Sequence, residues 1–134
     1  MKKENTTLRV GILGCGPISQ FAHLASAQKA RNVTLQAICD ADESLAQRFG
    51  SFYDAQKIYL DYDEMLSDDA VDAVIIAVSD AFHVPAAMKA LSAEKHVLCE
   101  KPLGTNVYEV EELARRLPNV PSTACWAWSF FELC

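Results

Sequence analysis

The stretch Val10-Gly11-Ile12-Leu13-Gly14-Cys15-Gly16-Pro17-Ile18-Ser19 decides the fold of this 134-residue chain. It opens with a short apolar run that ends in glycine, which is typical of a buried strand. Beyond the glycines, apolar residues fall on one face of a helix: Ile18, Phe21, Ala22 and Ala25. The stretch therefore predicts a strand, a tight turn and a helix.

The alternation of strand and helix patterns continues along the chain. Further strands are predicted at 33–39, 58–60, 73–78, 96–99 and 123–131, and helices at 43–49, 62–66, 84–91 and 106–117. Residues 73–78 lack polar alternation, which indicates a strand covered on both faces. Strands joined by helices pair in parallel, with helices on both faces. We therefore predict an α/β fold, a doubly wound parallel sheet in a single three-layer domain, with ligands at the carboxyl ends of its strands.

Two helices carry more detailed predictions. Gly50 is expected to end the helix at 43–49. Asn106 is expected to cap the last helix, with Glu109 three residues later. The apolar residues expected to face inward from that helix are Val107, Val110, Ala114 and Leu117.

Composition and charge exclude several classes of protein. Hydrophobic residues make up 51% of the chain and charged residues 22%, so the chain is not disordered as a whole. The net charge of −6 argues against a nucleic-acid partner. No apolar run reaches the roughly 20 residues of a membrane span, and no signal-peptide core is present, so a cytoplasmic location is expected. The five cysteines are odd in number and lack CxxC spacing, so neither a disulfide framework nor a metal site is expected.

The glycine turn has the spacing of a phosphate-binding loop. Gly14 allows the tight turn, and Gly16 lets the backbone approach a pyrophosphate at the positive end of the following helix. Ser19 is small enough for the third position, where the helix packs on the strand. The pattern predicts a dinucleotide site.

Asp40 follows the second predicted strand, 21 residues after Ser19 (40 − 19), close to the spacing of roughly 20 for a ribose-binding acid. A carboxylate there accepts hydrogen bonds from both ribose hydroxyls and repels a 2′-phosphate. This favours NAD over NADP. The alternative is a glycine turn with a surface aspartate that binds nothing.

The second half of the chain carries a more specific pattern. Residues 71–78 (VDAVIIAV) are followed by His83, by Ala90-Leu91 and by residues 95–103 (KHVLCEKPL). With the glycine turn, this resembles the N-terminal domain of the Gfo/Idh/MocA (glucose–fructose oxidoreductase and inositol dehydrogenase) family, from about Leu8 to Leu117. The resemblance implies that residues 1–134 form a dinucleotide-binding Rossmann domain and that the family's C-terminal substrate domain is absent from this chain. It also implies hydride transfer between NAD or NADP and a hydroxyl-bearing carbon, often of a sugar or cyclitol.

The resemblance also assigns residues to the site. The expected cofactor-binding residues are Gly14, Gly16, Pro17, Ile18, Asp40, Val78, Ser79, His83, Glu100 and Lys101. Lys101 is the expected catalytic residue, because a lysine at the carboxyl end of a buried strand can hydrogen-bond a substrate hydroxyl and favour charge on its oxygen. Glu100 either contributes directly or only holds the loop, and His83 is either structural or ligand-facing. His23 and His96 are interpreted as structural.

The chain departs from the family pattern at three places. Ser79-Asp80 stands where Thr-Pro is often found, and Glu94 stands where a glycine commonly precedes Lys-His-Val, so a different turn is expected there. No histidine matches the family's DxxxH general base. We therefore expect a domain that binds NAD without efficient turnover on its own, and a polyol or sugar substrate only when a second domain is supplied.

A second hypothesis is a non-catalytic dinucleotide-binding or interaction module. The segment from Cys125 to Cys134 contains Trp126, Trp128, Phe130 and Phe131, and an edge strand there would expose unpaired backbone groups. Exposed aromatic clusters often mark interfaces. This hypothesis predicts self-association through the aromatic segment, and a homo-oligomer is expected.

Overall fold

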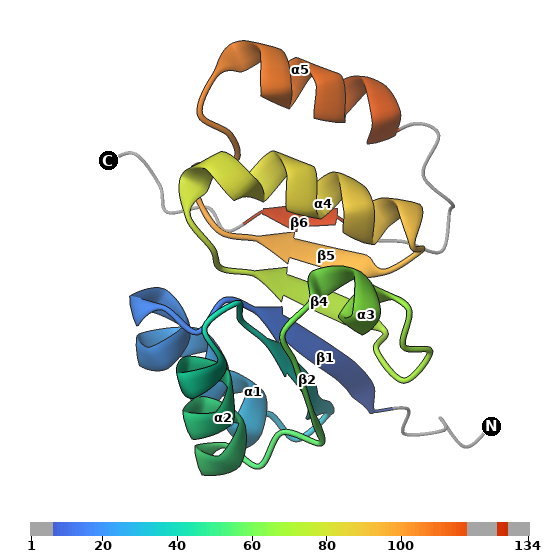
Figure 1. Ribbon diagram of the computed structural model, residues 1–134. Helices are drawn as coiled ribbons and strands as arrows, with labels where there is room; N and C mark the ends of the chain where they lie inside the picture. The colour runs from blue at the N-terminus through green and yellow to red at the C-terminus, as the bar shows by residue number, and fades with distance from the viewer. Residues whose placement is uncertain (1–6, 118–125, 129–134) are drawn as a thin grey trace, which may run out of the picture.

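The computed structural model describes residues 7–117 and 126–128. Its strands form one parallel sheet in the order β3-β2-β1-β4-β5-β6 (Figure 1). The strands are β1 (Leu8–Leu13), β2 (Val33–Cys39), β3 (Lys57–Tyr59), β4 (Ala73–Ile76), β5 (His96–Cys99) and β6 (Trp126–Trp128). The order reverses between β1 and β4, which is the arrangement of a Rossmann fold. The prediction of a doubly wound parallel sheet is confirmed.

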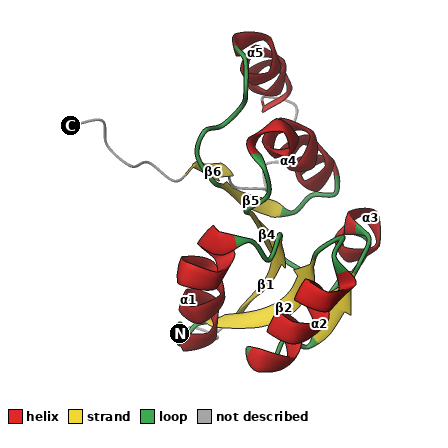
Figure 2. Cartoon of the chain, turned by 60° about the vertical axis from the view of Figure 1, so that its left-hand side comes forward, coloured by secondary structure: helices red, strands yellow, loops and turns green. Residues whose placement is uncertain are grey.

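Helices cover both faces of the sheet. They are η1 (Ser19–His23), α1 (Leu24–Lys29), α2 (Glu43–Phe52), α3 (Tyr62–Leu66), η2 (Asp80–Phe82), α4 (His83–Ser92) and α5 (Val107–Arg116). One apolar core joins α1 and α2 to the sheet, and the other joins α3, α4 and α5 to the opposite face. In Figures 1 and 2, α1 and α2 lie at the β1–β2 end of the sheet and α4 and α5 at the β5 end.

The first helix buries a different face from the one expected. The structure buries Ser19, Leu24 and Ala27, whereas Ile18 is 44% exposed and Phe21 is 86% exposed. The wider turn of the π-helix η1 shifts the register of the side chains that follow it, whereas Ile18 precedes η1 and lines a cleft at the carboxyl ends of the strands. A strict 3.6-residue period cannot anticipate that shift.

The last helix is also rotated from its predicted orientation. Leu113 is buried, while Val107 is 67% exposed and Ala114 is exposed, so the inward prediction was wrong at those two positions. The helix packs against α4 rather than against the sheet, and so buries a narrower stripe than expected. Its cap is confirmed, since the Asn106 side chain accepts a hydrogen bond from the Glu109 N–H.

Two turns differ from their predictions. Gly50 lies inside α2 and does not end it. The glycine instead allows close packing, since a Cβ at this position would lie 2.5 Å from Cδ1 of Ile58. Glu94 adopts a φ of 59°, the left-handed conformation that glycine favours. The expectation of a different turn before β5 was therefore wrong, because Glu94 takes up the strained conformation itself.

Only the backbone of Trp126–Trp128 is described, as the edge strand β6 beside β5, and the rest of Cys125–Cys134 lies outside the described residues. Self-association through this segment stays a prediction. Among the residues that are described, no helix has the length and apolar character needed to cross a membrane.

Asp68 links β3 to the loop before β4 and makes stability depend on pH. Its carboxylate accepts hydrogen bonds from Lys57 Nζ at 2.9 Å, Tyr59 Oη at 2.7 Å and the Ala70 N–H at 2.9 Å. These donors lower the pKa of Asp68 to about 2. A lowered folded-state pKa stabilises the protein above the unfolded value of about 4, and this stabilisation is lost as the pH falls through about 2.

We therefore expect the free energy of unfolding to fall between pH 4 and pH 2. In the Asp68→Asn variant, the free energy of unfolding should already be lower than in wild type at pH 7. It should also change less between pH 4 and pH 2. Urea denaturation at a series of pH values measures both effects. Equal pH dependence in the two proteins would contradict the assignment.

Candidate functional site

A cleft of about 680 Å³ opens at the carboxyl ends of β1, β2 and β4. The predicted cofactor residues that line it together are Gly14, Gly16, Pro17, Ile18, Asp40, Val78 and Ser79. Its other walls include Leu60, Asp61, Tyr62, Phe82, Pro85 and Lys89. The cleft lies where the strand order reverses, which is where open α/β sheets bind their ligands.

The two glycines of the turn have different structural roles. Gly14 has a φ of 97°, and a Cβ there would lie 2.5 Å from the carbonyl oxygen of Ala77. Its N–H donates to the Cys39 carbonyl at 2.8 Å, which joins the turn to β2. A Cβ on Gly16 would meet no atom within 4 Å. Gly14 is therefore required by packing, whereas Gly16 leaves backbone open to the cleft.

The turn leads directly into a helix. Helical conformation runs unbroken from Pro17 to Lys29, and the Ser19 hydroxyl donates to the Gly14 carbonyl. Pro17 suits the first helical position because its missing N–H would have no partner there. The first turn thus presents free backbone N–H groups and the positive end of the helix dipole to the cleft, which is an arrangement suited to phosphate.

Asp40 holds the glycine turn as well as lining the cleft. Its Oδ2 accepts a hydrogen bond from the Cys15 N–H at 2.7 Å, and its Oδ1 accepts one from the Asp42 N–H at 2.8 Å. Each carboxylate oxygen has two lone pairs, so both can accept a further bond from a ribose hydroxyl. The sequence analysis missed this bracing role, although an aspartate bonding the N–H two residues ahead is a common turn signature.

The cysteines beside the cleft are not nucleophiles. Burial, together with the charge of Asp40, raises the pKa of the Cys15 and Cys39 thiols to about 12. Thiols with such pKa values stay protonated at neutral pH. In residues 7–117 and 126–128, no group of three His, Cys, Asp or Glu side chains is placed to hold a metal ion.

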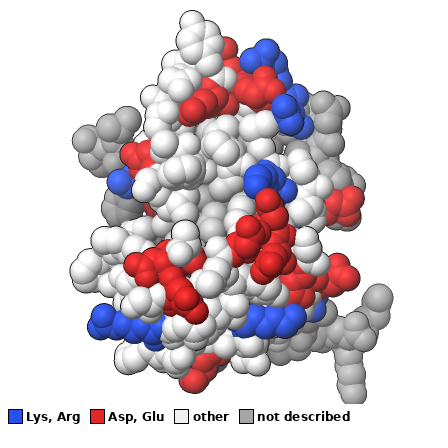
Figure 3. Space-filling model, viewed as in Figure 1, with Lys and Arg blue, Asp and Glu red and all other residues white. Residues whose placement is uncertain are grey.

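Acidic side chains are grouped on the face of the molecule that Figure 3 shows. Figure 3 shows several groups of Asp and Glu, one of them over α3. Lys89, which lines the cleft, forms an ion pair with Asp63 at 2.8 Å. The surface therefore favours a ligand bound by backbone N–H groups over one bound by a basic patch.

The remaining predicted site residues lie outside the lining of this cleft. Lys101 is exposed at the carboxyl end of β5, and no described residue forms a hydrogen bond or ion pair with its ammonium group. His83 is 1% exposed, with its ring nitrogens against the carbonyl oxygens of Val78, at 3.0 Å, and Pro102. His83 therefore contacts the loops around the cleft rather than the cleft itself.

Glu100 has a partner that sequence reasoning did not connect to the site. Its Oε1 lies 2.6 Å from Nε2 of His23, and the two side chains are only 12% and 15% exposed. Its Oε2 accepts a hydrogen bond from the Lys101 N–H at 3.2 Å. His23 was interpreted as structural because nothing in the local pattern links it to residue 100.

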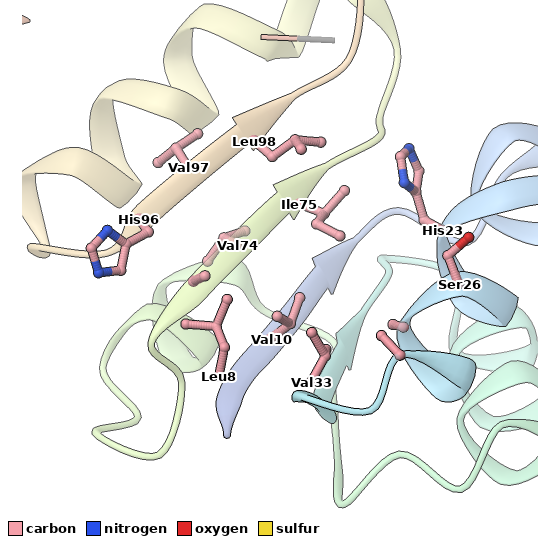
Figure 4. A pocket seen from close by; sticks show the side chains of 13 residues that line it. Leu8, Val10, His23, Ser26, Val33, Val74, Ile75, His96, Val97 and Leu98 are labelled. Carbon is pink, nitrogen blue, oxygen red and sulfur yellow. The ribbon is translucent and has the colours of Figure 1, made fainter. Parts of the chain in front are cut away.

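A second cavity lies between α1 and the strands β1, β4 and β5. It measures about 550 Å³, and apolar side chains of β1, β4, β5 and α1 form most of its wall (Figure 4). Its polar lining comes from His23, Ser26 and His96. It contains no glycine turn and no carboxylate, so it lacks the groups that bind a dinucleotide.

The comparisons with known proteins agree with the geometry of the cleft. Residues 8–123 match the model of the Gfo/Idh/MocA oxidoreductase family, NAD-binding Rossmann fold. The chain belongs to this family. It is an NAD-binding Rossmann domain of this family, and the predictions of the family, the fold and NAD binding are confirmed.

Similar proteins include inositol 2-dehydrogenase of Salmonella typhimurium, 34% identical over 80% of this chain and 32% of the relative. Trans-1,2-dihydrobenzene-1,2-diol dehydrogenase of Mus musculus is 34% identical over 81% of this chain and 33% of the relative. The crystal structure of an NAD binding oxidoreductase from Klebsiella pneumoniae superposes with a TM-score of 0.83 at 30% identity, covering 92% of this chain and 34% of that one. This chain spans about a third of the length of the curated relatives it matches.

Proposed function

We propose that this domain serves an oxidoreductase that transfers a hydride between NAD and a hydroxyl-bearing carbon of a sugar, cyclitol or related polyol. The observation that carries the proposal is the cleft, which brings the glycine turn, Asp40 and the loop after β4 together at the strand reversal. The substrate class is supported by relatives named as inositol and dihydrodiol dehydrogenases. NAD, when bound, supplies the hydride acceptor or donor.

The chain's own groups have distinct roles in this proposal. The backbone N–H groups of Gly16 and Ile18 hold the pyrophosphate, and Asp40 holds the ribose hydroxyls. Val78 and Ser79 border the path of the cofactor toward β5. Lys101, exposed at the carboxyl end of β5, hydrogen-bonds the substrate oxygen and stabilises charge that develops there.

The wider organisation is part of the same proposal. Residues 1–134 act as the dinucleotide-binding domain, and the substrate pocket forms with a second domain. The relatives are about three times as long as the part of them that this chain matches, which is long enough for such a domain. We further propose a cytoplasmic homo-oligomer that does not bind nucleic acid, consistent with the net charge of −6.

The cofactor preference tests the proposal. We expect the chain to bind NADH at least tenfold more tightly than NADPH, because the Asp40 carboxylate faces the ribose end and repels a 2′-phosphate; tenfold is about 1.4 kcal/mol. Calorimetric titration with each dinucleotide measures the ratio. Equal binding, or tighter binding of NADPH, would refute the preference, and binding of neither would refute the proposed function.

A further inference from the structure

Two histidines hold the short loop that carries Lys101. The loop residues on either side of the lysine are Glu100 and Pro102, and each is bonded to a histidine from a different element. His23 ends η1 on one face of the sheet, and His83 begins α4 on the other. Lys101 therefore lies between two anchors that reach it from opposite faces.

The His23 anchor is a nearly buried hydrogen bond between the His23 ring and the Glu100 carboxylate. An ionised carboxylate only accepts, so the His23 ring donates from Nε2 to Glu100 Oε1 across 2.6 Å. The second carboxylate oxygen of Glu100 accepts the Lys101 N–H, and the Glu100 N–H donates to the Ile76 carbonyl at 3.0 Å. Figure 4 shows the His23 ring beside the carboxyl end of β4. The helix that follows the glycine turn is thus bonded directly to the loop of Lys101.

The His83 anchor links the same loop to the wall of the cleft. One ring nitrogen contacts the Pro102 carbonyl and the other the Val78 carbonyl. A carbonyl oxygen only accepts, so a neutral ring donates to one of the two carbonyls and a protonated ring donates to both. Val78 lines the cleft. His83 therefore connects the cofactor path to the residue after Lys101.

We propose that His23 and His83 are positioning residues that couple the dinucleotide cleft to Lys101, so that the loop carrying the lysine is held in place from the cofactor side. The inference rests on the proposed function, in which Lys101 acts on the substrate oxygen. A catalytic group must be held close to its productive geometry, and groups bonded to its backbone do this. Neither histidine lines the cleft.

The test uses the 134-residue chain labelled with ¹⁵N. Amide hydrogen exchange at Lys101 and Leu103 is measured with and without NADH in wild type, His23→Ala and His23→Gln. A glutamine side chain can donate from the position of the imidazole Nε2, so it is the conservative replacement. Ser26→Ala is the matched control, because Ser26 lies about one turn after His23 and lines the same cavity. His83 is 1% exposed, so its removal would leave a cavity, and His23 carries the decisive variants.

We expect His23→Ala to speed exchange at Lys101 and Leu103 about tenfold, with His23→Gln within about threefold of wild type. NADH should slow exchange in this loop in wild type and in Ser26→Ala, but not in His23→Ala, although that variant still binds NADH. Unchanged exchange in His23→Ala would overturn the proposal. A uniform increase across β1 and β4 would also overturn it, since His23 would then be only structural. Failure of wild type to bind NADH would instead count against the proposed function.

Discussion

Replacing Gly14 with alanine should lower the free energy of unfolding by about 2–4 kcal/mol. A non-glycine residue at a φ of 97° is strained, typically by about 1–3 kcal/mol. The added Cβ would also lie 2.5 Å from the Ala77 carbonyl oxygen, so the turn or β4 must shift. Urea denaturation of the two proteins measures the loss.

Gly16→Ala is the matched control, with the opposite pattern expected. No atom lies within 4 Å of its Cβ position, so the free energy of unfolding should change by less than about 1 kcal/mol. The new methyl group would face the cleft where the pyrophosphate approaches, so NADH affinity should fall about tenfold or more. A stable Gly14→Ala protein, or unchanged NADH affinity in Gly16→Ala, would contradict the separate roles of the two glycines.

Replacing Asp40 with alanine should reduce both stability and NADH affinity. Two backbone N–H groups, of Cys15 and Asp42, lose their acceptor, which should lower the free energy of unfolding by about 1–3 kcal/mol. Loss of the bonds to both ribose hydroxyls should weaken NADH binding at least tenfold and narrow the gap to NADPH.

Asp42→Ala separates these two effects. This variant removes the carboxylate that caps α2 but keeps the backbone N–H that bonds Asp40. It should cost about 1 kcal/mol of stability and leave the preference for NADH unchanged. An Asp40→Ala protein that keeps the full preference for NADH would show that the carboxylate does not recognise the ribose.

The order of the elements could be predicted because each strand and helix carries a local period. Residues 73–78 predict a buried strand from their unbroken apolar run, and Asn106 predicts a helix start from a cap three residues before Glu109. Which face a helix buries depends on its partners. The π-turn in η1 and the packing of α5 on α4 therefore rotated both helices away from the predicted faces.

The residues of the cleft could be predicted because the glycine turn and Asp40 form a pattern with fixed spacing. The histidine contacts could not, because His23 and Glu100 are 77 residues apart and are brought together only by the sheet. The double role of Asp40 was missed for a related reason, since one carboxylate can bond backbone and ligand at once. Contacts of this kind depend on the tertiary structure.

The central claim is that NAD binds in the cleft at the strand reversal. Titrating the ¹⁵N-labelled chain with NADH and following its amide resonances tests this most directly. We expect the largest shifts at the non-proline residues from Gly14 to Ser19, at Asp40 and Ala41, and at Val78 and Ser79, with little change at Ala30 and Val33 in the second cavity. Shifts centred on Ala30, Val33 and His96, with none at the glycine turn, would contradict the account.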